Sequence, residues 1–387
     1  MKVLLYADFR SPHAKGWRSG LISAGIEVLA VSSEPADDVE IVSPSDSVSR
    51  ARQSYVHSGR QRRGILRSVV RRLSAVQIFH SMIQVVREKS RKQHLLRSID
   101  SFKPDLIHAL RLPYEGIIAL SAGSKVPVVV SSWGSDFVPQ ARQDPILRAW
   151  LRKYLSSADG YQYDSPADLE RALEFGLLSS APTIHAAGNF GVDEALFHMS
   201  DESIPGLVVY ARKVTPNSNY FGFVEAALKL MKTTDATFIG VGLDKIADQV
   251  TARFGEYDSV RLRLIGELSR EDFARTIRSA QVVVSPSHWD GMPNTILEAA
   301  ACGAKIVAGD LPQLRELLAL NVDIALVDAG SSDEIAIGIE RQLLSQSASR
   351  AAVLPDEYSR SQNVSRIQSF YESVMVGSRV PGTHTAS

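Results

Sequence analysis

The feature that most constrains the fold of this chain is a series of short apolar runs separated by segments long enough for a helix. Most runs are rich in Val and Ile and lack the clean alternation of a strand with one solvated face. Such runs are typical of strands buried on both faces of a parallel sheet, with crossover helices between them. They lie at 3–7, 27–31, 106–110, 127–132, 160–164, 183–187, 207–211, 236–241, 261–266, 282–287, 305–310 and 323–328.

The runs form two sets, which predicts two Rossmann-like domains. With 387 residues, the chain is long enough for each domain to bury its own core. We expect an N-terminal domain over 1–200 and a C-terminal domain over 206–355, followed by a helix at 356–379 that crosses back to the first domain. The segment 203–206 is the expected hinge, because proline and glycine interrupt it. Residues 380–387 form an expected disordered tail.

The composition limits which kinds of site and which cellular compartment fit this chain. The chain has 43 Lys and Arg against 43 Asp and Glu, so its formal net charge is zero, and 44% of its residues are hydrophobic. A single cysteine, Cys302, excludes an intramolecular disulfide framework and a CxxC zinc site, and it fits a reducing compartment. No stretch reaches the roughly 20 apolar residues that span a bilayer. We therefore expect a cytoplasmic protein.

The segment after the run at 282–287 carries the clearest candidate site. Ligands of open parallel sheets bind beyond the carboxyl ends of the strands, near the next helix. Gly291 permits a tight turn and Pro293 suits the first helical position, so free backbone amides there could bind a phosphate. Glu298 could accept hydrogen bonds from sugar or ribose hydroxyls. In the alternative interpretation, Asp290 only caps the helix and Glu298 lies on its solvated face.

The segment from Asp290 to Ala299, followed by Ala301-Cys302-Gly303, resembles the acidic-x7-Glu signature of the GT4-type retaining glycosyltransferases. The resemblance implies an α/β GT-B fold, in which two Rossmann-like domains face each other across a central cleft. Further similar motifs follow the family's order along the chain. They are Ser11–Trp17, Asp105–Ala109, Trp133–Asp136, Asn189–Asp193 with Phe197, Tyr210–Arg212 and Gly266–Leu268.

The resemblance also implies roles for the matched residues. Glu298 would bind the nucleotide ribose and Asp290 the donor sugar, while Arg212 would neutralise the leaving diphosphate. Asp290 and Arg212 are thus the catalytic candidates, and His13 and Asp136 are candidates on the acceptor side. The other residues expected at the donor are Gly16, Leu268, Gly291, Met292, Asn294 and Thr295. The nucleotide sugar is a substrate, and the family needs neither a cofactor nor a metal ion.

Three positions depart from the family's pattern. Asp290 stands where the first acidic residue is usually Glu. Asn217 occupies the spacing at which the family has a lysine, and the adjacent Lys213 should point to the other face if the strand continues. Trp133 stands where many relatives have His. These differences concern the diphosphate and sugar contacts.

Residues 50–98 are strongly basic. Thirteen Lys and Arg face one acidic residue, Glu88, which gives a local net charge of +12 and leaves −12 for the remainder. Apolar residues recur among the arginines at helical spacing, from Ile65 to Leu73. A basic helix with an apolar stripe suits the headgroup region of an anionic membrane. The alternative is a solvated helix packed on the core, and nucleic-acid binding is disfavoured because aromatic residues are sparse.

Together these features predict an enzyme that moves a sugar from a nucleotide-sugar donor to a hydroxyl acceptor. The expected acceptor is a lipid-linked saccharide in surface-polysaccharide or glycolipid synthesis, with the protein peripheral at the inner face of the membrane. One alternative is a glycosyltransferase that acts on a soluble natural-product acceptor. Another is a non-catalytic GT-B partner in a glycan assembly complex, which Asp290 and the missing lysine would suggest.

Overall fold

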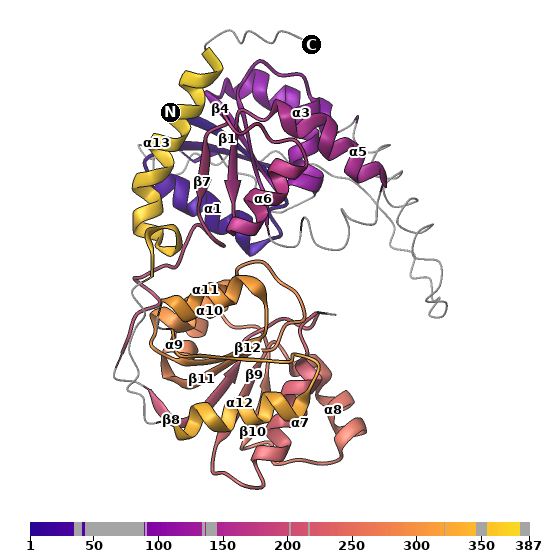
Figure 1. The fold of residues 1–387 in the computed structure, drawn as a ribbon, viewed down its shortest axis with the longest axis vertical. Coiled ribbons are helices and arrows are strands. Elements are labelled where there is room, and N and C mark those ends of the chain that lie inside the picture. The colour runs from indigo at the N-terminus through magenta and orange to yellow at the C-terminus, as the bar shows by residue number, and fades with distance from the viewer. Residues whose placement is uncertain are drawn as a thin grey trace. The chain divides into compact units, whose positions relative to one another are not determined.

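The computed structural model describes residues 1–34, 41–42, 89, 91–133, 136, 145–200, 203–215, 217–320, 322–345 and 354–379. Most of the basic segment 50–98, and the expected tail 380–387, lie outside these residues. The contacts divide the chain into two compact units, Met1–Phe190 with Gln362–Ser387, and Gly191–Ser361 (Figure 1).

The first unit is built on a seven-stranded sheet of order β3-β2-β1-β4-β5-β6-β7. All neighbouring strands are parallel except β2 and β3. Its elements are β1 (Lys2–Ala7), α1 (Pro12–Ser23), β2 (Glu27–Ser32), β3 (Ile41–Val42), a helix over 91–102, β4 (Leu106–Leu110), the π-helix η1 (Leu112–Gly116), α3 (Ile117–Ser121), β5 (Val128–Ser131), α5 (Pro145–Tyr154), the 3₁₀ helix η2 (Leu155–Ser157), β6 (Gly160–Tyr163), α6 (Pro166–Glu174), β7 (Thr183–His185) and α13 (Arg360–Arg379).

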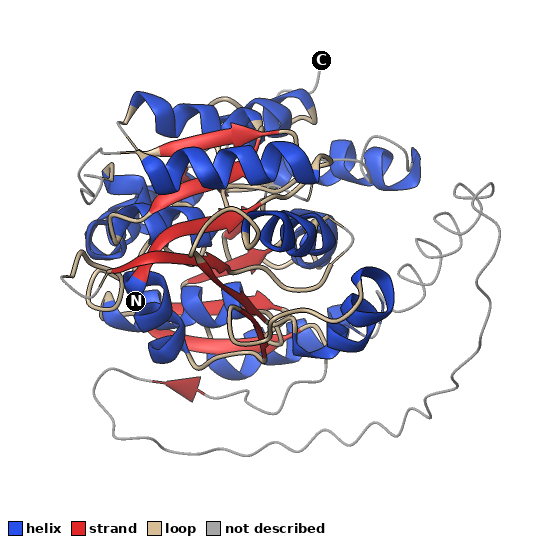
Figure 2. Cartoon of the chain, turned by 90° about the horizontal axis from the view of Figure 1, so that it is seen from below, coloured by secondary structure: helices blue, strands red, loops and turns tan. Residues whose placement is uncertain are grey.

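The second unit is built on a six-stranded, fully parallel sheet of order β10-β9-β8-β11-β12-β13. Its elements are β8 (Ile204–Tyr210), α7 (Tyr220–Leu230), β9 (Thr237–Val241), the 3₁₀ helix η3 (Asp244–Ile246), α8 (Ala247–Phe254), β10 (Leu262–Ile265), α9 (Arg270–Ser279), β11 (Ala280–Ser285), α10 (Asn294–Ala301), β12 (Lys305–Gly309), α11 (Pro312–Ala319), β13 (Ile324–Val327), α12 (Ser332–Leu344) and the 3₁₀ helix η4 (Asp356–Tyr358). Helices lie on both sides of the strands (Figure 2).

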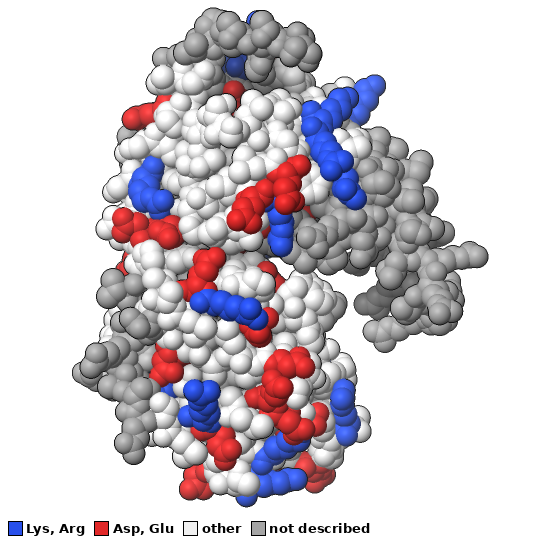
Figure 3. Space-filling view, viewed as in Figure 1, with Lys and Arg blue, Asp and Glu red and all other residues white. Residues whose placement is uncertain are grey.

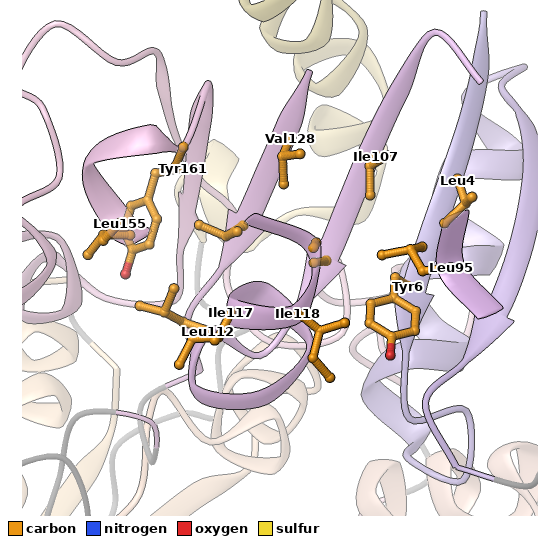
Figure 4. Close-up of a cluster of buried hydrophobic side chains, with 14 of the residues drawn as sticks. Leu4, Tyr6, Leu95, Ile107, Leu112, Ile117, Ile118, Val128, Leu155 and Tyr161 are labelled. Carbon is orange, nitrogen blue, oxygen red and sulfur yellow. The ribbon is translucent and has the colours of Figure 1, made fainter. Parts of the chain in front are cut away.

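Burial on both faces explains why the strand sequences do not alternate. Successive residues of β1 enter different cores. Leu4 and Tyr6 pack in the same core as Leu95 of the helix over 91–102 (Figure 4). Val3 and Leu5 pack in the core that includes residues of α1 and α13. Both faces of a parallel sheet covered by helices require apolar residues at every position. The predicted α/β architecture is confirmed, and every expected strand is present.

The C-terminal helix α13 packs on the first unit, although the chain reaches it only after completing the second. Its buried residues Ile367, Phe370, Tyr371 and Val374 belong to the core that includes α1. A buried side chain of this size contributes about 1.5–3 kcal/mol. His108 in β4 joins this core through hydrogen bonds of 2.6 Å to the Tyr371 hydroxyl and of 2.6 Å to the Ser131 hydroxyl. Burial lowers the pKa of His108 to about 3, so the imidazole is neutral.

The expected hinge at 203–206 is wrong, because Ile204, Pro205 and Gly206 begin strand β8. Proline lacks an amide hydrogen and is tolerated at the start of a strand. The register between β8 and β11 shifts between Ala280 and Val282, and the Gly206 amide donates to the Gln281 side chain. The irregular pairing thus accommodates the Pro-Gly pair within the sheet. The division between the units falls earlier, at Phe190.

Candidate functional site

The carboxyl edge of the second unit's sheet brings Arg212 and Asp290 together. Arg212 follows β8 and Asp290 follows β11, and these two strands are neighbours in the sheet. The Nη2 of Arg212 donates to Oδ2 of Asp290, and the two side chains are 19% and 23% exposed. Burial raises the pKa of Asp290 above its usual value, and Arg212 opposes that shift. The two catalytic candidates therefore form a half-buried ion pair at the edge where parallel sheets bind ligands.

The loop that carries Asp290 is held by a residue from α11. The Nε2 of Gln313 donates to the carbonyl oxygens of Asp290 at 2.6 Å and of Gly291 at 2.8 Å. The Gly291 amide donates to Oδ1 of Asp290 at 3.0 Å, and Met292 is buried. The carboxylate of Asp290 is therefore fixed by its own loop as well as by Arg212.

Glu298 lies on the second turn of α10 and is 3% exposed. Its Oε1 accepts a hydrogen bond of 2.5 Å from Nη2 of Arg270, which begins α9. Burial raises the pKa of Glu298, and Arg270 opposes that shift. The alternative that places Glu298 on a solvated face is therefore wrong. Asp290 is not a helix cap either, because Pro293 occupies the N-cap position without a side-chain hydrogen bond.

The other candidates of the second unit lie on segments that follow β10 and β11 at the same edge of the sheet. Asn294 and Thr295 begin α10, and the Thr295 hydroxyl donates to the Ala211 carbonyl at 3.4 Å. Leu268 is half-buried in the loop between β10 and α9. These residues all follow carboxyl ends of strands, as the motifs imply.

The two residues near the missing lysine have defined contacts. The Nδ2 of Asn217 donates to the Trp289 carbonyl at 2.7 Å, so Asn217 ties the loop after β8 to the loop after β11. Lys213 lies 3.6 Å from Oε1 of Glu267, beside the loop of Leu268. Because β8 ends at Tyr210, strand alternation does not fix the direction of Lys213.

In the first unit, Gly16 lies within helix α1 and not in a loop, contrary to the sequence interpretation. The helix begins at Pro12, since Ser11 accepts a hydrogen bond of 3.2 Å from the His13 amide and proline needs no partner there. A Cβ on Gly16 would lie 2.9 Å from the Cβ of Asn189. The glycine therefore permits close packing of α1 against the turn before Phe190.

The acceptor-side candidates lie at the carboxyl edge of the first unit's sheet. Asp136 is 1% exposed, and its Oδ1 accepts from Nε of Arg111 at 3.2 Å. Its Oδ2 accepts from the Trp133 amide at 3.0 Å, and burial raises the pKa of Asp136 although Arg111 opposes the shift. The His13 ring lies 4.9 Å from the Trp133 ring, between centroids.

Sequence reasoning missed Arg270, Gln313 and Arg111. Each makes its contact with a residue from a different strand or helix, so no local spacing marks it. Only the position of Arg270 gave a signal, because Arg270 begins the helix that follows the Gly266–Leu268 motif.

Neither a metal-ligand cluster nor a membrane-spanning helix is found in the described part of the chain. There, no group of three or more His, Cys, Asp or Glu could hold a metal ion. Among the helices in the same ranges, none is both long and apolar enough to cross a bilayer.

Comparisons with known proteins bear on both units. Residues 11–188 match a family model described as glycosyl transferase 4-like domain, and residues 205–345 match the model of glycosyl transferases group 1. A UDP-Gal:alpha-D-GlcNAc-diphosphoundecaprenol alpha-1,3-galactosyltransferase of Escherichia coli is 26% identical over 102 residues, which cover 26% of this chain and 26% of that protein.

Solved structures match nearly the whole chain. A sucrose-phosphate synthase of Thermosynechococcus elongatus has a TM-score of 0.64 at 16% identity and covers 97% of this chain and 96% of its own. Anabaena HepE, solved with UDP and glucose, has a TM-score of 0.59 at 15% identity, with 96% and 100% covered. At these identities the structures show the fold. The two family models, which match one unit each, show that the chain belongs to the GT4-type glycosyltransferases with a GT-B fold.

Proposed function

We propose that this protein transfers a sugar from a nucleotide-sugar donor to a hydroxyl group of a saccharide acceptor. One observation carries the proposal: two arginine–carboxylate pairs, Arg212 with Asp290 and Arg270 with buried Glu298, lie around one loop and one helix start. Burying a carboxylate is unfavourable unless the group has a partner of opposite charge. Carboxylates of this kind can accept hydrogen bonds from sugar and ribose hydroxyls, and the arginine can bind phosphate oxygens.

In this mechanism the two carboxylates bind hydroxyl groups of the donor, and the positive groups stabilise the negative charge that forms as the bond breaks. Glu298 accepts hydrogen bonds from the ribose, and Asp290 binds the donor sugar. As the sugar leaves, negative charge builds on the nucleoside diphosphate, where Arg212 and the amides at the start of α10 stabilise it. We propose that these groups replace a metal ion and that the anomeric configuration is retained, as in the family.

The proposed acceptor is a lipid-linked saccharide. The Escherichia coli relative is named for transfer to a diphosphoundecaprenol-linked sugar. Residues 50–98, with a net charge of +12, would bring a cytoplasmic enzyme to an anionic membrane surface. By contrast, acidic and basic side chains are interspersed over the face of the molecule drawn in Figure 3.

Sedimentation with vesicles of phosphatidylcholine, with and without phosphatidylglycerol, tests the membrane contact. We expect binding only to the anionic vesicles, and release at high salt because the attraction is screened. Equal binding to both vesicles, or to neither, would contradict the membrane proposal and favour a soluble acceptor.

A thermal-shift screen against UDP-, GDP-, ADP- and dTDP-sugars tests the donor site. A ligand present at a hundred times its Kd stabilises the folded state by about 2.7 kcal/mol, so a bound donor raises Tm. Glu298→Gln keeps the shape of the buried side chain and should weaken the nucleotide at least tenfold. Glu256→Gln, an exposed glutamate of the same unit, is the matched control. If wild-type protein binds no nucleotide sugar, the proposed function fails.

A further inference from the structure

At the carboxyl edge of the first unit's sheet, five side chains form what we call the Arg111 cluster. Its members are His13, Arg111, Tyr114, Trp133 and Asp136. They come from the start of α1, the end of β4, η1 and the segment after β5. None of them belongs to the donor-side residues, all of which except Gly16 lie in the second unit.

The backbone of Arg111 has an unusual conformation. Its φ is 85° and its ψ is 102°, a region that residues with a Cβ avoid and that costs about 1–3 kcal/mol. The π-helix η1 follows directly, and the Gly116 amide donates to the Arg111 carbonyl at 3.0 Å. Strained residues and single π-turns concentrate at functional sites. A glycine would relieve the strain, so the arginine side chain is retained at a cost to the backbone.

The guanidinium of Arg111 is held at its Nε end and is partly exposed. Its Nε donates to Asp136, whose side chain is fully buried, whereas the Arg111 side chain is 32% exposed. Its Cζ lies 4.9 Å from the centroid of the Tyr114 ring and 5.9 Å from that of Trp133. Within the described part of the chain, the Nη atoms of Arg111 have no hydrogen-bond partner. Its outward N–H groups can therefore bind a pair of anionic oxygens in a fixed geometry.

Two features beside Arg111 suit an anionic group next to a ring, although Asp136 and Glu115 also place acidic side chains close to its guanidinium. His13 is the second residue of α1, a helix whose first turn contains no acidic residue, so the helix dipole adds positive potential there. The partly exposed Trp133 and His13 rings, 4.9 Å apart, provide an aromatic surface against which the apolar face of a sugar can pack.

We propose that the Arg111 cluster is the acceptor site and that it selects a sugar carrying an anionic group, a phosphate or a carboxylate. Arg111 binds the anionic oxygens through its two Nη groups, and Trp133 packs against the sugar ring. Asp136 is a positioning residue, because it fixes Arg111 and the Trp133 amide without facing the ligand. This inference rests on the proposed function, and it names the acceptor's chemical class.

The test titrates the full chain with three probes, α-D-glucose 1-phosphate, D-glucuronate and methyl α-D-glucoside. The nucleotide found by the thermal-shift screen is present at saturation, so that the donor site is filled. The indole N–H resonance of Trp133, assigned with Trp133→Phe, reports binding in the first unit. Arg111→Gly removes the guanidinium at a position where glycine suits the backbone, and Arg10→Ala removes an exposed arginine of the same edge as the control.

We expect at least one anionic probe to bind ten times more tightly than the neutral glucoside, and the tighter of the two identifies phosphate or carboxylate. Arg111→Gly should abolish the preference, and Arg10→Ala should leave it unchanged. Should Arg111→Gly lower Tm, the double variant Arg111→Gly/Asp136→Asn removes the unpaired buried carboxylate. Equal affinity for all three probes, or a preference that survives either Arg111 variant, would overturn the inference. Nucleotide binding by all these proteins keeps that failure distinct from a failure of the proposed function.

Discussion

The carboxyl edges of the two sheets are built on the same plan but differ in what surrounds the ion pair. Arg212 and Asp290 in the second unit, and Arg111 and Asp136 in the first, each join an arginine after one strand to an acid after its neighbour. The edge of the second unit departs from the family's motifs at Asp290 and Asn217, and that of the first unit departs at Trp133. Only the first unit's arginine has a strained backbone, with a φ of 85° at Arg111. We infer that the two pairs serve different ligands, the donor in the second unit and the acceptor in the first.

The buried glutamates of the two units extend this contrast. Glu298 is held by Arg270, so an arginine opposes the rise of its pKa. Glu115 in η1 accepts a hydrogen bond from the Ser33 hydroxyl, but its Oε2 has no partner in the described part of the chain. Burial raises the pKa of Glu115 to about 7. The first unit therefore keeps a carboxyl that is largely neutral below that pH.

The largest effect is expected from Arg212→Ala, which removes the proposed cation of the leaving diphosphate. Loss of one such stabilising group costs about 3–4 kcal/mol in the transition state, so kcat should fall by about 10²–10³. Arg315→Ala, which breaks an exposed arginine–aspartate pair in the same unit, is the control. Steady-state kinetics of sugar transfer at saturating donor give the kcat of both variants. A drop of less than threefold in Arg212→Ala would show that this edge does not stabilise the leaving group.

A smaller effect is expected from Glu115→Gln, measured as the pH dependence of stability. The folded-state pKa of about 7 lies above the ordinary value of 4.5, so the folded protein binds more protons between these two values. The free energy of unfolding of the wild type should therefore fall as pH rises through that window, by up to about 3 kcal/mol. In Glu115→Gln the free energy of unfolding should fall less over the same pH range, because this residue no longer titrates.

Urea unfolding at pH 5 and pH 8 makes that comparison. Asp168, with a pKa raised to about 6 by burial, contributes in an overlapping window in both proteins, and Asp168→Asn measures its share. If wild type and Glu115→Gln lose the same stability between the two pH values, the glutamate is ionised in the folded protein and the contrast with Glu298 disappears.

The smallest effect is expected from metal removal. Because Arg212 and the α10 amides are proposed to supply the positive charge, treatment with EDTA should leave kcat within about twofold of its untreated value. Activity lost to EDTA and restored by Mg²⁺ or Mn²⁺ would assign the leaving-group charge to a metal ion instead.

The sequence predicted the strands, and it also pointed to the segment that carries Asp290 and Glu298 at the carboxyl edge of the second unit's sheet. Both have a physical reason. Strands buried on both faces need continuous apolar runs, and these are visible without a structure. The Asp290–Glu298 segment is local, since one loop and one helix carry both acids. Its partners Arg270 and Gln313 come from other elements, and their contacts arise only when the sheet is assembled.

Other features lay beyond local sequence reasoning. The short strand β3 has too few residues to produce a pattern. Pro205 and Gly206 look like a hinge, but an irregular register lets them begin β8. Arg111 has an ordinary sequence context, and only its positive φ and its ion pair with Asp136 distinguish it. Gly16 suggested a donor loop, whereas its packing against Asn189 explains the glycine.

The division of roles between the two edges is tested most directly by steady-state kinetics in which donor and acceptor concentrations are both varied. Glu298→Gln and Arg111→Gly are compared with the wild type on an anionic acceptor. We predict that Glu298→Gln raises the KM of the donor at least tenfold and leaves that of the acceptor within twofold, and that Arg111→Gly does the reverse. If both variants raise the KM of the same substrate, the assignment of donor and acceptor to separate units is wrong.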